Sequence, residues 1–183
     1  MTKLAPKRLE LLRDMVPDAR HYFALINPAG NLADAFTKGL NAAAATLGIQ
    51  IDVLRASTDF EIEAAFAAIS QKPRSVLVSG TDAFFFVRRE KISTLALRYG
   101  VAIIWDAPAY TKAGGLISYS ADDVDLMLLT ASYTGRILKG EKPADLPVLQ
   151  PTKFVLTINI KTAKMLGIKV PQALLATADE IID

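Results

Sequence analysis

Cysteine is absent from the 183 residues, and histidine occurs once, as His21. Without cysteine the chain forms no disulfide and has no thiolate nucleophile or cysteine metal ligand. A single histidine leaves any histidine metal site or serine–histidine triad resting on one residue. We therefore expect no metal site, and we interpret His21 as a surface or edge residue at the start of a strand.

Sequence motifs of the common nucleotide-binding and hydrolytic sites are also missing. The chain contains no G-x-G-x-x-G, G-x-x-x-x-G-K-[ST], G-x-S-x-G or H-E-x-x-H. These absences argue against dinucleotide, P-loop, serine-hydrolase and zinc-protease chemistry. We expect no cofactor and no catalytic residue, so the chain is predicted not to be an enzyme.

Neither a strong excess of charge nor a long apolar run is present. The formal net charge is +2, from 21 Lys+Arg against 19 Asp+Glu, and basic runs stop at two residues. Nucleic acid is therefore not an expected partner. No apolar stretch approaches the roughly 20 residues that span a bilayer. Met1 is followed by a polar stretch without the apolar core of a signal peptide, which predicts a cytoplasmic chain unless a longer protein begins upstream.

The sequence does contain a regular alternation of predicted strands and helices. Short apolar or β-branched runs predict strands, and amphipathic stretches predict the helices between them. Thr58-x-x-Glu61 is a capping box at a helix start, and Gly48 and Gly100 are placed as helix stops. The alternation predicts an α/β fold with a parallel sheet and helices on both of its faces. The predicted strands are 21–26, 49–54, 75–79, 101–105 and 116–119.

Different elements precede and follow this unit. A helix is predicted over 4–16, and Ser120-x-x-Asp123 is predicted to cap another helix that ends near Leu138. The proline-rich segment 142–151 then suggests that the chain leaves the unit and returns to it. The remaining predicted elements are a strand over 154–158, a short helix capped by Asn159, and a tail introduced by Val170.

A buried strand that leads through a polar turn into a helix organises the chain, at residues 76–82. Similar units precede and follow it, so several polar loops should meet at the carboxyl edge of the sheet, where open α/β sheets bind small molecules. Helix N-termini there suit a carboxylate or phosphate, and Asp82 or Asp106 suits an ammonium or hydroxyl group. No nucleophile is paired with a base, which favours binding over catalysis, although each residue alone could simply cap a helix. The candidate residues are Asn27, Pro28, Ser79, Gly80, Thr81, Asp82, Trp105, Asp106, Ser118 and Tyr119.

Aromatic residues near this edge leave alternatives open. Trp105 ends a strand, where an aromatic ring either lines a ligand pocket or plugs the end of the sheet. Phe84, Phe85 and Phe86 open a helix, and three consecutive residues cannot all face the core at 3.6 residues per turn. At least one of the three is predicted to lie in the core, which leaves another free to face a ligand or a second lobe.

Six segments together resemble one known family. They are 7–12 (KRLELL), 27–28 (NP), 114–119 (GGLISY), 137–147 (ILKGEKPADLP), 150–154 (QPTKF) and 158–168 (INIKTAKMLGI). With these segments the chain resembles the solute-binding components of bacterial ABC transporters, in the family that includes tryptophan-binding proteins. The resemblance covers nearly the whole chain.

This resemblance implies a type I periplasmic-binding-protein clamshell, of which the chain holds one flavodoxin-like lobe. Residues 1–19 would lead in from a first lobe whose opening half, with any signal peptide or lipid anchor, lies upstream of Met1. Residues 20–119 would form the solute-binding lobe. Residues 120–150 would be a helix and linker that pack with the first lobe, and 151–183 would be the returning strand, short helix and tail.

The resemblance also implies a function. The chain would be the solute-binding component, or its second lobe, of an ABC-type importer. It would bind a small polar solute, such as an amino acid, and would interact with an ABC permease. The full-length protein would lie in the periplasm or be anchored to the outer face of a membrane. By resemblance, Asp82 meets an amino group and Asn27 a carboxylate, with Ser79, Trp105 and Tyr119 as flanking contacts. The surface meant for the absent lobe predicts a homo-dimer. The alternatives are a stand-alone intracellular ligand-sensing or regulatory domain and, with less support, an enzyme on a flavodoxin-like fold.

Overall fold

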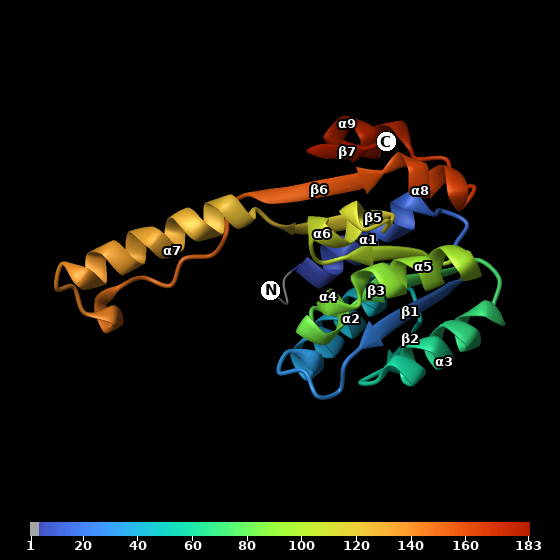
Figure 1. Cartoon of the computed structure of the whole chain (residues 1–183), viewed down its shortest axis with the longest axis horizontal. Coiled ribbons are helices and arrows are strands. Elements are labelled where there is room, and N and C mark those ends of the chain that lie inside the picture. Colours follow the sequence, from blue (N-terminus) through green and yellow to red (C-terminus); the bar gives the residue numbers. More distant parts are fainter. Residues whose placement is uncertain (1–3) are drawn as a thin grey trace.

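A seven-stranded sheet in the order β2-β1-β3-β4-β5-β6-β7 runs through the computed structural model, which describes residues 4–183 (Figure 1). The strands are β1 (His21–Ile26), β2 (Ile51–Arg55), β3 (Ser75–Ser79), β4 (Ala102–Trp105), β5 (Ile117–Ala121), β6 (Phe154–Asn159) and β7 (Glu180–Ile182). The helices are α1 (Ala5–Met15), α2 (Ala33–Leu47), α3 (Asp59–Ser70), α4 (Ala83–Val87), α5 (Arg89–Tyr99), α6 (Pro108–Lys112), α7 (Asp123–Leu138), the 3-10 turn η2 (Pro143–Asp145), α8 (Ile160–Met165) and α9 (Gln172–Thr177).

The first five strands are parallel, as the strand–helix alternation predicts. β3 and β4 are buried at every position, which agrees with the continuous apolar runs that form the centre of a parallel sheet. β6 then pairs antiparallel to β5, with Ile117 opposite Ile158, and β7 pairs parallel to β6. The carboxyl ends of β1, β3 and β4 therefore lie at one edge of the sheet.

Helices cover both faces of this sheet and create two hydrophobic cores. α1 and α2 pack on one face, and α3, α5 and α6 pack on the other. The first core includes Leu9, Leu12, Phe36, Leu40 and Ala163. The second includes Ile62, Phe66, Phe85, Ile92 and Tyr110. The α/β fold class predicted from the sequence is confirmed.

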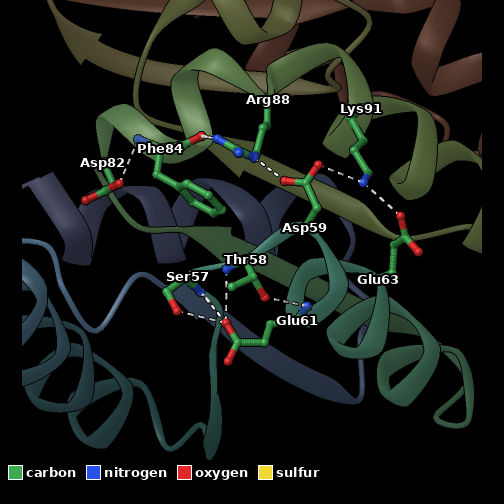
Figure 2. A network of polar contacts seen from close by, with 9 residues as sticks. All are labelled: Ser57, Thr58, Asp59, Glu61, Glu63, Asp82, Phe84, Arg88 and Lys91. Atoms are coloured by element: carbon green, nitrogen blue, oxygen red, sulfur yellow. Dashed lines mark hydrogen bonds and ion pairs between the residues drawn. The ribbon is translucent and has the colours of Figure 1, made fainter.

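Several predicted helix ends are confirmed. Thr58 and Glu61 form the reciprocal capping box at the start of α3, shown with Ser57 in Figure 2. Gly48 and Gly100 end α2 and α5 in the left-handed conformation, at φ 66° and φ 65°. Glycine adopts that conformation without the steric cost that other residues incur.

Two helix boundaries differ from the sequence prediction. The expected single helix after Asp82 is interrupted at Arg88 (φ −98°, ψ 13°), whose guanidinium turns back to the Phe84 carbonyl (3.3 Å). Ser120 does not cap α7, because it is paired within β5; Asp122 takes that place and accepts from the N–H groups of Val124 (2.8 Å) and Asp125 (3.2 Å).

The carboxyl-terminal tail is also more ordered than its sequence indicates. α9 precedes β7, and the Asp179 carboxylate accepts a hydrogen bond from the Leu156 N–H (2.8 Å). The Asp179 N–H in turn donates to the Leu156 carbonyl (2.9 Å). This reciprocal pair docks the tail beside β6 and adds the seventh strand.

One helix stands apart from the two cores. Figure 1 shows α7 extending away from the sheet, with the segment that follows it running back beside it. No residue of α7, over Asp123–Leu138, is buried. The Tyr133 hydroxyl donates a hydrogen bond to the Pro147 carbonyl, which ties the helix to its return segment. Within residues 4–183 no helix combines the length and the apolar character needed to cross a membrane.

Candidate functional site

An open cavity of about 650 Å³ lies at the carboxyl edge of the sheet. Three of the predicted site residues, Thr81, Asp82 and Asp106, lie in its wall, at the ends of β3 and β4. The other lining residues are Asn31, Leu32, Ala83, Phe86 and Tyr110. The strand-end loops therefore meet as the sequence predicts, and they line an open depression at the surface of the lobe.

Asn27 and Asp82 lock two of these loops together. Asn27 Nδ2 donates a hydrogen bond to Asp82 Oδ1 (2.9 Å), and Asn27 Oδ1 accepts from the Ala29 N–H (3.1 Å). Asp82 Oδ1 also accepts from the Phe84 N–H (2.8 Å) and so caps α4 (Figure 2). A Cβ at Gly30 would lie 2.4 Å from Asp82 Oδ2, so this glycine allows the close approach of the two loops.

Ser79 and Gly80 fix the backbone at the end of β3. Ser79 is fully buried, and its hydroxyl bonds to the Gly80 carbonyl (3.2 Å). The Gly80 N–H donates to the Leu25 carbonyl (2.8 Å), and a Cβ on Gly80 would lie 2.9 Å from that oxygen. The end of β3 can therefore lie flat against β1 only with glycine at position 80. Pro28 is exposed in the neighbouring loop.

A second, smaller cavity of about 70 Å³ shares Thr81 and Asp106 with the first. Its other lining residues are Leu4, Arg8, Ser120, Ala121, Asp123 and Leu126. Asp106 Oδ1 and Ser120 Oγ are buried without a hydrogen-bond partner among residues 4–183. Burial raises the pKa of the Asp106 carboxyl, and the Arg8 guanidinium and the Thr81 hydroxyl oppose this rise.

Arg8 is the charged residue that the sequence reading did not place in the site. It is 3% exposed on α1, and its Nε donates a hydrogen bond to the Tyr119 carbonyl (2.8 Å), 111 residues away in the chain. Burial lowers the pKa of Arg8, and Asp106 and Tyr110 act in the opposite direction. The available signal was its spacing, because Arg8 falls on the same helical face as Ala5, Leu9 and Leu12.

Tyr110 was not among the predicted site residues, yet it lines the cavity. The predicted residue Trp105 lies behind it. The Trp105 ring is fully buried and stacks on Tyr110, with centroids 4.3 Å apart. Tyr110 lines the larger cavity, and its buried hydroxyl has no hydrogen-bond partner in the described chain. Burial strongly raises the pKa of Tyr110. Phe85 lies in the core as predicted for one of the three phenylalanines, while Phe86 lines the cavity and contacts Tyr110 edge-on at 5.6 Å.

Two predicted residues of β5 do not line the open cavity. Ser118 is fully buried. The Tyr119 ring stacks on Phe154, with centroids 5.8 Å apart, and packs against the first core. The Tyr119 carbonyl accepts the hydrogen bond from Arg8, and the Tyr119 ring does not line the cavity. His21 begins β1, at the opposite edge of the sheet.

Three carboxylates and one guanidinium line the two cavities, and they belong to Asp82, Asp106, Asp123 and Arg8. A second guanidinium, that of Arg89, lies 5.1 Å from the centroid of the Phe86 ring beside the larger cavity. In the described part of the chain, no group of three or more His, Cys, Asp or Glu residues is arranged to hold a metal ion. The lining offers hydrogen-bond acceptors, hydroxyl groups and apolar surface, which together suit the binding of a small polar molecule.

The sequence family described as ABC transporter substrate binding protein matches residues 2–182. The chain belongs to this family. The match extends over both the α/β lobe and the α7 segment, so the compact and the projecting parts of the chain belong to one family. A comparison with curated proteins finds no match.

Solved structures show the same fold as this chain. A conserved domain protein from Vibrio cholerae superposes with a TM-score of 0.88 at 26% identity, over 97% of this chain and 60% of that chain. An ABC domain from Streptococcus pneumoniae in complex with L-Trp also has a TM-score of 0.88, at 25% identity over 97% and 60%. A ligand-free, open substrate-binding protein from Clostridium difficile has a TM-score of 0.73 at 20% identity, over 96% and 59%, which shows the fold alone. The chain thus spans about 60% of the length of these proteins.

Proposed function

We propose that this substrate-binding protein holds a small polar solute, such as an amino acid, at the carboxyl edge of its sheet and performs no catalysis. The open cavity of about 650 Å³ lined by Thr81, Asp82 and Asp106 is the observation that carries this proposal. Acceptor oxygens lie beside Leu32 and Phe86, so the cavity can meet both a polar group and an apolar side chain. The L-Trp complex of the Streptococcus pneumoniae relative supports an amino acid as the class of solute.

The longer relatives support a role for α7 and for the partners. Since the chain spans about 60% of their length, we propose that a second lobe closes over the cavity in a complete clamshell. The exposed apolar side chains of α7, among them Met127 and Leu128, are the proposed contact with that lobe. In keeping with the family, the complete protein is proposed to act outside the cytoplasm and to deliver the solute to an ABC permease in the membrane.

Calorimetric titration of the chain with the twenty amino acids tests this proposal. At least one should release heat that saturates, and it should raise the unfolding temperature as its concentration passes the dissociation constant. Thr81→Tyr fills the cavity and should weaken that binding at least tenfold. Thr94→Tyr, an equal change on the exposed side of α5, is the matched control and should leave it unchanged. Absence of heat and of stabilisation for every amino acid would refute the proposal.

A further inference from the structure

Arg8 is a charged side chain that the proposed function leaves without a role. It is 3% exposed on α1, and its Nε donates a hydrogen bond to the Tyr119 carbonyl at 2.8 Å. A guanidinium keeps its positive charge at neutral pH even in the interior of a protein. Burying that charge is costly unless an opposite charge lies near it, so the groups around Arg8 indicate what it does.

The opposite charge is that of Asp106, which follows the end of β4. Both side chains line the small cavity of about 70 Å³, and their charges attract each other there. Asp106 Oδ1 is buried and has no hydrogen-bond partner among residues 4–183, so hydrogen bonds satisfy this carboxylate only in part. A carboxylate in that condition depends on a nearby positive charge to remain ionised.

Within the described chain, Arg8 is the only basic residue that lines the small cavity with Asp106. The other packed elements contribute acidic or neutral groups around Asp106, namely Asp82 before α4, Tyr110 on α6, Ser120 on β5 and Asp123 on α7. The Arg89 guanidinium lies beside the larger cavity, 5.1 Å from the centroid of the Phe86 ring. Burial raises the pKa of Asp106, and Arg8 is the strongest of the groups that lower it. The ionised state of Asp106 therefore rests on Arg8.

Asp106 in turn acts on Thr81, one of the site residues predicted from the sequence. Thr81 and Asp106 line both cavities, and the Thr81 hydroxyl acts as a hydrogen-bond donor to the Asp106 carboxylate. An ionised carboxylate only accepts hydrogen bonds, whereas a protonated one carries a donor of its own. The charge of Asp106 therefore sets the direction of the Thr81 hydroxyl in the wall of the open cavity.

We propose that Arg8 is a positioning residue of the solute site: its buried charge keeps Asp106 ionised, and Asp106 holds the Thr81 hydroxyl in the wall of the open cavity. This assignment rests on the proposed solute-binding function and adds to it a residue of α1, outside the strand-end loops. The bond to the Tyr119 carbonyl fixes the guanidinium in its place. Arg8 does not line the open cavity, so it acts through Asp106 and not by touching a solute.

Titration of the carboxyl ¹³C chemical shifts in the chain without solute tests the step from Arg8 to Asp106. Arg8→Met removes the charge, so the pKa of Asp106 should rise, and the Thr81 methyl shift should follow the same raised midpoint. Arg8→Lys keeps the charge and should leave that midpoint close to its wild-type position. Lys7→Met removes an equal charge from the exposed side of α1 and should leave the pKa of Asp106 unchanged.

Calorimetric titration with L-tryptophan, from about pH 5 to about pH 8, tests the step to the solute site. Affinity should fall as the pH falls through the pKa of Asp106, because protonation removes the acceptor of the Thr81 hydroxyl. The fall should come at higher pH in Arg8→Met than in wild type, with a loss of about fivefold between the two midpoints. In Asp106→Asn, which does not titrate, adding Arg8→Met should change the affinity by less than about twofold, because Arg8 acts through Asp106.

The outcomes separate this assignment from the function on which it rests. An unchanged pKa of Asp106 in Arg8→Met overturns the assignment, and so does a Thr81 methyl shift that does not follow it. Equal effects of Arg8→Lys and Arg8→Met would assign the result to the fold and not to the charge, which also contradicts it. Circular dichroism checks each fold, and Arg8→Gln takes the place of Arg8→Met if that variant does not fold. If the ¹³C titrations behave as expected but no amino acid binds the wild-type chain, the proposed function fails and the link from Arg8 to Thr81 stands.

Discussion

The α/β lobe and the projecting helix α7 use the same kind of sequence in opposite ways. In α3 the apolar side chains of Ile62, Phe66 and Ile69 are fully buried against the sheet. In α7 apolar residues recur at helical spacing as well, yet Met127 and Leu128 are 71% and 65% exposed. The comparison shows that an amphipathic pattern predicts a helix and its need for a partner, but does not say where that partner lies.

The largest expected difference comes from the same substitution in each region. Leu9→Ala in α1 removes a fully buried side chain from the first core and should lower the free energy of unfolding by about 2–5 kcal/mol. Leu128→Ala in α7 should change it by less than about 0.5 kcal/mol, because its side chain is already in solvent. Urea unfolding followed by circular dichroism measures both, and equal losses would show that α7 is packed in the free chain.

Association of the free chain should depend on α7 and not on the lobe. The exposed apolar residues Val124, Met127 and Leu128 favour self-association at high concentration. Leu128→Glu should shift sedimentation toward the monomer, whereas Phe60→Glu, a change at an 80% exposed position of α3, should not. A wild-type chain that sediments as a monomer at every concentration would contradict this prediction.

Loss of a helix cap should lower global stability in the lobe but only local stability in α7. Thr58→Ala removes the side chain that accepts from the Glu61 N–H at the start of α3, and should cost about 1 kcal/mol of global stability. Asp122→Ala removes the cap of α7, which packs on neither core, so faster hydrogen exchange within α7 is expected without a shift of the urea midpoint. A shift of that midpoint as large as that of Thr58→Ala would refute the distinction.

The smallest effect is expected at the exposed ion pairs between α3 and α5. Lys91 Nζ lies 2.8 Å from Glu63 and 3.2 Å from Asp59 (Figure 2). Water and salt screen such pairs, so Lys91→Met should shift the urea midpoint less than Thr58→Ala does. Repeating the measurement in 1 M salt should remove most of the difference from wild type; a difference that survives salt would contradict the assignment of the effect to the exposed ion pairs.

Local patterns predicted much of the lobe. The bounds of β1 and β3 match the predicted 21–26 and 75–79, because buried parallel strands are continuous apolar runs that end at polar turns. Gly48 and Gly100 were identified as helix stops because left-handed geometry at a helix end favours glycine. The convergence of Thr81, Asp82 and Asp106 followed from the parallel topology alone.

Features that depend on contacts between residues far apart in the chain could not be predicted from the sequence. Arg8 meets Tyr119 across 111 residues, and nothing near Arg8 in the sequence reveals that partner. All four positions of β4 are buried, so no alternation tells which face Trp105 takes, and Tyr110 rather than Trp105 reaches the cavity. The tail becomes a strand through Asp179 and its bonds to Leu156, which again join segments far apart in the chain.

The central claim is that the carboxyl edge of the lobe, and not the apolar face of α7, binds the solute. Titration of the ¹⁵N-labelled chain with L-tryptophan, followed by amide chemical shifts, tests this claim most directly. Saturable shifts should concentrate at Leu32, Thr81 and Asp106 and leave the middle of α7 unchanged. Shifts confined to α7, around Met127 and Leu128, would contradict the account.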